Sequence, residues 1–285
     1  MARAPGPTQS GPVTYGVIIG ERGDAARWKN ERRLLRRGPG TFYRKLQTLE
    51  HLARRDRGAV ARFLAAPCPV SRRTRLGLLR RFLSITNAVR GYHTLGEILE
   101  VSARVLRLAG RPGLTIVECG SAAGASTAKL SLVARAAGAR LHVFDTFRGI
   151  PDNEERHHLL DGTPIRFVKG AFRGRLGAVQ RRVRELGAVE VCTFHKGLFE
   201  DTLPAFEGVV DVGLLDVDLV ASTRTCVREL FPRLRRGGAL YSQDGHLRAT
   251  HELLADEGFW LEDVGFARPR IADLGREKLL VITAE

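Results

Sequence analysis

The sequence of 285 residues lacks long apolar runs, closely spaced cysteines and an apolar N-terminal stretch. No run approaches the ~18 to 20 apolar residues of a membrane-spanning helix, so a transmembrane protein is excluded. The first twelve residues lack the apolar stretch of a secretory signal. Four scattered cysteines (Cys68, Cys119, Cys192 and Cys226) form no CxxC pair, which argues against a zinc knuckle and a disulfide framework. These absences predict a cytoplasmic protein.

Acidic residues are scarce only in the N-terminal part. Residues 1–110 hold 22 Lys and Arg against 7 Asp and Glu, whereas residues 111–285 hold 24 of each. Of the 46 basic residues 40 are Arg, which is typical of a GC-rich bacterial genome. Three interpretations of the basic region stay open: a solvated helical face, a surface for an anionic substrate or carrier protein, and nucleic-acid binding. No zinc finger or RNP-type aromatic motif supports the last.

Composition and the spacing of apolar residues divide the chain into three regions. Residues 1–40 are basic and begin with a Pro-, Gly- and Ser-rich tail, which predicts a partly disordered segment. Residues 41–110 are predicted to form a helical lid region, and residues 111–285 the main domain. Apolar spacing in the lid region predicts helices at about 42–52, 58–65, 73–85 and 95–108.

Residues 111–285 alternate between short apolar strands and helices. The predicted strands are 114–118, 141–145, 191–195, 210–216, 238–242, 259–264 and 279–283. The predicted helices are 125–137, 176–186, 222–234 and 249–256. Helices between successive strands are typical of an α/β wound parallel sheet. The last two strands lack a helix between them, which predicts that one of them is antiparallel.

A glycine-rich turn joins the first predicted strand to its helix. Gly120 and Gly124 let the backbone turn sharply and approach a ligand, and the helix start offers free N–H groups to an anion. Glu118 precedes the turn and suits an ammonium group, while Asp145 ends the next strand, where a ribose diol binds. Together these groups match S-adenosyl-L-methionine, and an ordinary tight turn is the alternative for the glycines alone.

Four stretches give a more specific indication: 117–126, 144–151, 196–204 and 215–223. In this order they resemble the macrocin O-methyltransferase family, which methylates sugar hydroxyls of macrolides and other natural products. The resemblance spans about residues 90–245. It implies a Rossmann-like seven-stranded methyltransferase sheet, S-adenosyl-L-methionine as the methyl donor and, in many members, a divalent metal at the acceptor site.

The resemblance also implies roles for single residues. The methionine end of the cofactor is expected at the glycine turn and its flanks, that is Glu118, Gly120, Ser121, Gly124 and Ser126. The ribose is expected at Asp145, with Thr146 and Phe147 beside it. The adenine is expected near Lys196, Gly197 and Phe199. Asp216, at the end of the fourth predicted strand, lies next to the cofactor and the metal.

The acceptor site departs from the family pattern. Asp216 and Asp244 are the predicted Mg²⁺ ligands, but Gln243 stands where the family usually has an acid. An amide removes a charge and weakens a site for a hard cation. Gln243 or His246 would complete the site as a third contact. In the alternative, no metal is needed and His246 or Asp216 acts as general base.

Two further features have competing interpretations. His157 and His158 lie in a polar loop, for which a solvated loop is favoured over a substrate lid. Asp218 is a second metal ligand or a helix cap. Tyr92 precedes the sheet where family members often cover the cofactor.

The sequence therefore predicts a methyltransferase that acts on a small-molecule acceptor, with O-methylation of a sugar or related hydroxyl as the expected reaction. An anionic or carrier-bound acceptor and a homo-oligomer stay open. One alternative is an RNA or DNA methyltransferase that uses the basic region. The other is a non-catalytic partner of the same fold.

Overall fold

The computed structural model describes residues 56–274 and 278–284. The predicted segment 1–40 and the predicted helix at about 42–52 lie outside the described residues. Among the helices that the structure describes, none has the length and apolar character needed to cross a membrane.

A seven-stranded sheet forms the centre of the molecule, in the order β5-β2-β1-β6-β7-β9-β8. Its strands are β1 Thr115–Cys119, β2 Arg140–Asp145, β5 Cys192–Lys196, β6 Val210–Leu215, β7 Leu234–Ser242, β8 Ile271–Ala272 and β9 Leu280–Thr283. The first five pair in parallel, whereas β9 pairs antiparallel with both β7 and β8. This confirms the predicted α/β sheet and its antiparallel end.

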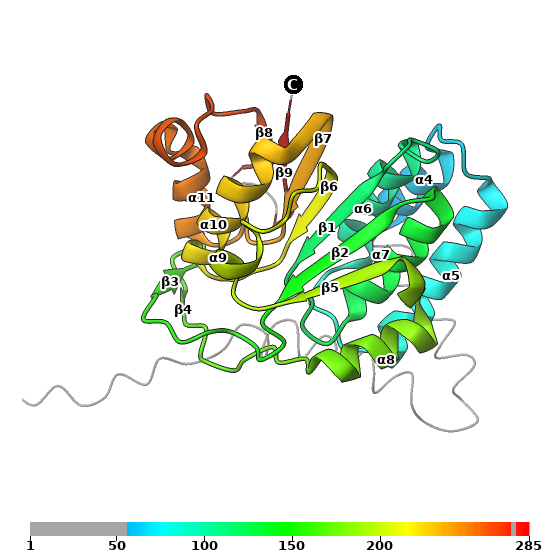
Figure 1. Ribbon diagram of the computed structural model, residues 1–285, viewed down its shortest axis with the longest axis horizontal. Helices are drawn as coiled ribbons and strands as arrows, with labels where there is room; N and C mark the ends of the chain where they lie inside the picture. Colours follow the sequence, from blue (N-terminus) through cyan, green and yellow to red (C-terminus); the bar gives the residue numbers. More distant parts are fainter. Residues whose placement is uncertain (1–55, 275–277, 285) are drawn as a thin grey trace, which may run out of the picture.

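Helices cover both faces of the sheet (Figure 1). One face carries α4 Arg57–Ala65, α5 Arg72–Ala88, α6 Leu95–Arg107, α7 Ala125–Ala137 and α8 Leu176–Leu186. The other carries α9 Phe199–Thr202, α10 Val220–Leu230 and α11 Arg248–Ala255. Single 3₁₀ turns lie at η1 Val189–Val191 and η2 Phe231–Arg233. A two-stranded hairpin of β3 His157–His158 and β4 Pro164–Ile165 lies apart from the main sheet.

The helices before residue 110 share one hydrophobic core with the sheet. Phe82 of α5 and Leu99 of α6 belong to the same buried cluster as Ile116 of β1. A capping box stabilises the start of α6. The Thr94 backbone N–H donates to the Glu97 carboxylate, and the Glu97 backbone N–H donates to the Thr94 hydroxyl. The described part of the predicted lid region is therefore packed against the sheet.

The predicted strand at 259–264 is wrong. Phe259–Val264 is a π-helical turn (η3), and the seventh strand is β8 instead. A strand would point the adjacent side chains of Phe259 and Trp260 to opposite faces, whereas both are buried here. Trp260 packs on Phe231, with the ring centroids 5.0 Å apart, and its indole N–H donates to the Leu254 carbonyl at 2.9 Å. The apolar run thus forms a buried helical turn in which Trp260 is a packing residue.

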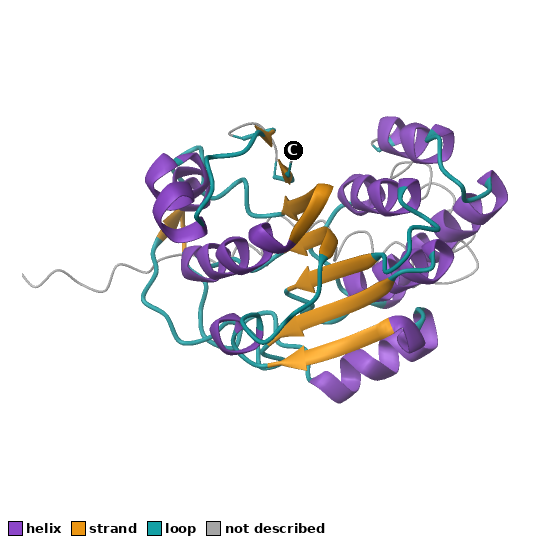
Figure 2. Cartoon of the chain, turned by 45° about the horizontal axis from the view of Figure 1, so that its top comes forward, coloured by secondary structure: helices purple, strands orange, loops and turns teal. Residues whose placement is uncertain are grey.

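The sheet reverses its winding at β1, the middle one of its five parallel strands. β1 pairs with β2 on one side and with β6 on the other, so the chain leaves the centre in both directions. The carboxyl ends of the parallel strands lie together along one edge of the sheet, as their arrowheads in Figure 2 show. Ligands of open α/β sheets bind at the crevice that this reversal creates.

Candidate functional site

A cavity of about 580 Å³ opens at that edge of the sheet. The turns after β1, β2, β6 and β7 contribute Gly120, Asp145, Asp216 and Asp244 to its lining. Residues of the segment 146–175 between β2 and α8, which we call the roof loop, line another side of the cavity. One face of α10 forms a further wall.

The turn after β1 requires glycine. Gly120 has φ +91°, and a Cβ added there would lie 2.0 Å from the carbonyl oxygen of Asp216. The backbone of the first turn therefore packs directly on the backbone of the turn after β6. Gly124 has φ +84° and starts α7 without a side-chain cap, which leaves N–H groups of the first turn of this helix for an anion.

Asp145 fixes the position of this turn. Its carboxylate accepts hydrogen bonds from the backbone N–H groups of Ser121 at 2.7 Å, Ala122 at 3.2 Å and Phe147 at 2.6 Å. Burial raises the pKa of Asp145 above its ordinary value, although these N–H groups and the Thr146 hydroxyl act against the shift. The side chain lines the cavity and also ties the ends of β1 and β2 together.

Glu118 is fully buried at the end of β1, two residues before Gly120, and does not itself line the cavity. Neither of its carboxylate oxygens has a hydrogen-bond partner among the described residues. Burial raises the pKa of Glu118 to about 8, partly offset by the nearby Ser126 and Thr127 hydroxyls and increased by the charges of Asp145 and Asp216. A buried carboxylate without partners is costly unless a cation or a donor meets it. An ammonium group of a ligand fits this requirement.

The remaining predicted cofactor residues fall into two groups. Thr146 and Phe199 line the cavity, as does Asp216. Those that do not line it are Ser121, Gly124, Ser126, Phe147, Lys196 and Gly197. Ser121 and Phe147 act through the N–H groups that hold Asp145, and the Gly197 N–H bonds the Asp145 carbonyl at 3.2 Å.

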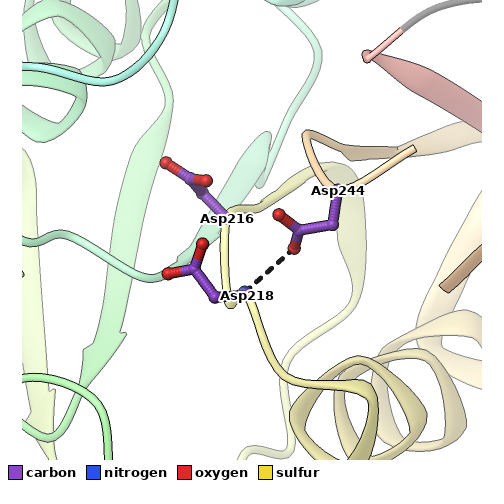
Figure 3. Close-up of side chains that lie close together, drawn as sticks. All are labelled: Asp216, Asp218 and Asp244. Atoms are coloured by element: carbon purple, nitrogen blue, oxygen red, sulfur yellow. Dashed lines mark hydrogen bonds between the residues drawn. The ribbon is translucent and has the colours of Figure 1, made fainter. Parts of the chain in front are cut away.

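Three carboxylates converge at the acceptor end of the cavity (Figure 3). Asp216 and Asp218 follow β6, and Asp244 follows β7; one ligand atom from each lies within 4.8 Å of the others. One Asp244 oxygen accepts the N–H groups of Val217 and Asp218, both at 3.1 Å. These bonds hold the turn in which Asp218 adopts φ +63°.

The electrostatics of this trio suit a hard cation. Burial raises the pKa of Asp218 well above its ordinary value, the Asp244 and Asp216 charges raise it further, and Lys278 lowers it. The second oxygen of Asp244 is buried and has no hydrogen-bond partner among the described residues. Three carboxylates with an unpaired oxygen form a donor set of the kind that Mg²⁺ prefers.

The sequence left Asp218 open between a second metal ligand and a helix cap. Asp218 fills the place for which Gln243 or His246 was expected. The Gln243 amide instead donates to Glu97 of α6 at 3.3 Å, and Gln243 does not line the cavity. The replacement of an acid by Gln243 therefore removes no charge from the trio. His246 lines the cavity close to Asp244 in sequence.

The interpretation of the histidine loop also changes. His158 is exposed, but His157 is only 2% exposed and pairs with Glu155 at 3.1 Å. Both residues belong to the roof loop, of which Asn153, Glu155 and Phe167 line the cavity. A solvated loop is thus wrong for His157. Tyr92 also lines the cavity, with its ring 4.7 Å from the ring of Phe172.

Comparison with known proteins agrees with this geometry. Residues 117–245 match a family described as "Methyltransferase domain". The chain is 34% identical over 163 residues to the 8-demethyl-8-(2,3-dimethoxy-alpha-L-rhamnosyl)-tetracenomycin-C 4'-O-methyltransferase of Streptomyces olivaceus. This match covers 52% of the chain and 58% of that relative, so the chain spans little more than half the length of the curated relative.

Two solved structures share the fold. The O-methyltransferase NovP has a TM-score of 0.54 at 22% identity, over 66% of this chain and 78% of its own. The calicheamicin methyltransferase CalS11 has a TM-score of 0.53 at 16% identity, over 88% of this chain and 95% of its own. Residues 117–245 thus match a methyltransferase-domain family, which agrees with the resemblance predicted from the sequence.

Proposed function

We propose that the protein is an S-adenosyl-L-methionine-dependent methyltransferase that methylates a hydroxyl of a sugar on a small-molecule natural product. The proposal rests on one observation: two groups of residues with different chemistry lie at opposite ends of one cavity. A glycine turn preceded by the partnerless Glu118 suits the cofactor, and three carboxylates at the other end suit a metal-assisted hydroxyl. The name of the Streptomyces olivaceus relative supports a glycosylated acceptor.

At the cofactor end, the chain binds and orients the methyl donor. Glu118 holds the ammonium group, the N–H groups at the start of α7 hold the carboxylate, and Asp145 holds the ribose. Transfer needs the acceptor oxygen in line with the sulfonium methyl, so positioning supplies much of the rate.

At the acceptor end, Asp216, Asp218 and Asp244 would hold one Mg²⁺. When bound, the ion supplies Lewis-acid chemistry that favours loss of the hydroxyl proton. In the rival mechanism no metal is used and His246, which lines the cavity, takes up that proton. Activity after exhaustive chelation, compared with activity of a His246→Ala variant, separates the two.

The charged residues that line the cavity indicate which class of acceptor it binds. Two basic residues, Arg228 and Lys278, line it together with seven acids: Asp145, Asp152, Glu155, Glu200, Asp216, Asp218 and Asp244. One divalent cation leaves this lining acidic, so phosphate-bearing acceptors are disfavoured. We therefore infer a neutral or cationic glycoside rather than the anionic or carrier-bound acceptor left open by the sequence.

The alternatives are less well supported. No arginine of α4 or α5 lines the cavity, so the described basic residues give no route for a nucleic-acid strand to the reacting atoms. A non-catalytic partner was favoured by Gln243 alone, and Gln243 lies outside the trio. Neither alternative has a specific observation in its favour.

A substrate panel tests the proposal. The protein is incubated with S-adenosyl-L-methionine, Mg²⁺ and either a neutral rhamnosylated tetracenomycin or a nucleoside-diphosphate rhamnose. We expect methylation of the neutral glycoside and at least tenfold lower kcat/KM for the diphosphate sugar. Preference for the diphosphate sugar would refute the inferred acceptor class, and no cofactor binding at all would refute the methyltransferase function.

A further inference from the structure

The roof loop is a self-closed segment that bears on the acceptor end of the cavity. Its two ends are joined by the Ile150 N–H to the Ala171 carbonyl at 2.9 Å and the Gly170 N–H to the Ile150 carbonyl at 2.8 Å. Asn153 crosses it, because its amide donates to the Phe167 carbonyl at 3.2 Å. A closed loop of this kind moves as one body unless something docks it.

Besides the buried cluster in which Phe167 packs with Leu219 and Leu247, two polar contacts dock the roof loop on the elements that carry the trio. Glu155 accepts the backbone N–H of Val220 at 2.8 Å and that of Ala221 at 3.1 Å, which are the first two residues of α10. Further along, the Leu160 N–H donates to the His246 carbonyl at 3.1 Å. α10 begins two residues after Asp218, so the first contact lies beside the trio.

The surroundings of Glu155 favour its charged form. Burial alone would raise its pKa, but hydrogen bonds from His157 and from the N–H groups of Ala221 and Val220 lower the pKa below the ordinary value. His157 is itself buried against Phe167, with ring centroids 5.3 Å apart. A carboxylate at the start of α10 also meets the positive end of the helix dipole.

We propose that Glu155 is a positioning residue for the acceptor, an inference that rests on the proposed function. Glu155 supplies the cap that α10 otherwise lacks, since the N-cap Leu219 gives no side-chain hydrogen bond. In doing so it fixes the distance between the roof loop and the turn that carries Asp218. This contact acts together with the packing of Phe167 against Leu219 and Leu247 to hold the acceptor wall, which Asn153, Phe167 and Ala221 line.

The cofactor end does not depend on Glu155. Its turns are held by Asp145 and by backbone packing of Gly120 on Asp216. Replacement of Glu155 should therefore affect the two ends differently: the KM for the acceptor should rise, whereas the affinity for the cofactor should not change.

The test compares Glu155→Ala, Glu155→Gln and the control Glu154→Ala, whose side chain is exposed at the neighbouring position. Acceptor KM is measured with the neutral rhamnosylated tetracenomycin, and cofactor Kd by calorimetry with S-adenosylhomocysteine. For Glu155→Ala we expect KM to rise about tenfold to a hundredfold, as for loss of charge-assisted hydrogen bonds. Cofactor Kd should stay within about twofold, because its contacts do not include Glu155. Glu155→Gln, which keeps one acceptor oxygen, should lie between, and Glu154→Ala should match wild type.

Amide hydrogen exchange gives a readout that needs no turnover. The Val220 and Ala221 amides should exchange faster in Glu155→Ala than in wild type and Glu154→Ala. An unchanged KM in an active Glu155→Ala variant, or an equal loss of cofactor affinity, would overturn the inference alone. Wild-type protein that binds no cofactor and methylates nothing would instead overturn the proposed function.

Discussion

The cofactor end of the cavity rests on residues that are close in sequence, whereas the acceptor end gathers residues from separate segments. Glu118, Gly120 and Asp145 lie within two consecutive strand ends, and hydrogen bonds among their turns hold them. The acceptor end combines the turns after β6 and β7 with the roof loop and α10. At the cofactor end, hydrogen bonds hold the turns, but neither oxygen of Glu118 has a partner among the described residues. At the acceptor end, three carboxylates concentrate negative charge. Each end therefore suits a different cation: the ammonium group of the cofactor at one end and a divalent metal ion at the other.

The largest expected effect is at the cofactor end, in Glu118→Gln. Loss of this buried carboxylate should weaken S-adenosylhomocysteine binding by about a hundredfold or more, since the ammonium charge of the ligand is left unpaired. Calorimetry measures the affinity, with exposed Glu185→Gln as control. Equal affinities of wild type and Glu118→Gln would remove Glu118 from the site.

The same substitution has an opposite effect on stability without ligand. The pKa of Glu118 is raised to about 8, so its burial destabilises the fold increasingly as pH rises from about 4.5 to 8. Below that window the carboxyl is protonated in the folded and unfolded states alike. Glu118→Gln should therefore unfold at a higher temperature than wild type at pH 8.5, with the difference vanishing near pH 4. Thermal melts across this range measure it, and a pH-independent difference would contradict the burial argument.

The acceptor end should depend on a divalent cation. Exhaustive chelation should lower turnover about a hundredfold, a typical loss when metal-bound charge stabilisation is removed, and added Mg²⁺ should restore it. Mg²⁺ should also raise the melting temperature of wild type but not of Asp244→Asn, which keeps an oxygen to accept the N–H groups of the turn after β6. Full activity after chelation, with a large loss in His246→Ala, would favour the metal-free mechanism.

Asp145→Ala should have an intermediate effect. Loss of a charge-assisted hydrogen bond to the ribose is worth about 1.5 to 3 kcal/mol, or roughly tenfold to a hundredfold in cofactor affinity. Because Asp145 also holds the backbone of Ser121 and Phe147, the Ala variant should lose stability as well. Asp145→Asn should recover part of the stability. Unchanged calorimetric affinity in Asp145→Ala would refute its assignment.

The smallest effect is expected for Gln243→Glu, which restores the acid usual in the family. Gln243 bonds Glu97 and not the trio, so the new carboxylate would meet a like charge. We expect no gain in Mg²⁺ affinity and a loss of stability of about 1 kcal/mol. Tighter Mg²⁺ binding in this variant would place residue 243 at the metal after all.

The difference between the ends also explains what could be predicted from the sequence. The glycine turn and Asp145 are local signals, since a strand, a turn and a helix within a few residues fix their geometry. Asp218 was ambiguous, because a carboxylate between a strand and a helix can serve as a metal ligand or as a helix cap, and the sequence does not show the turn in which Asp218 adopts φ +63°. Glu155 gave no signal at all, because its partners lie 65 and 66 residues away. The strand predicted at 259–264 failed since period alone does not separate a short apolar strand from a helical turn.

One measurement addresses the shared cavity most directly. S-adenosyl-L-methionine with an isotopically labelled methyl group is incubated with the protein, Mg²⁺ and the neutral rhamnosylated tetracenomycin, and the product is located by mass spectrometry and NMR. One cavity that holds a donor at Gly120 and Asp145 and an acceptor at the trio predicts a single labelled methyl on a sugar oxygen, lost on chelation. Binding of both ligands with no label on the glycoside, or label on an oxygen outside the sugar, would contradict it.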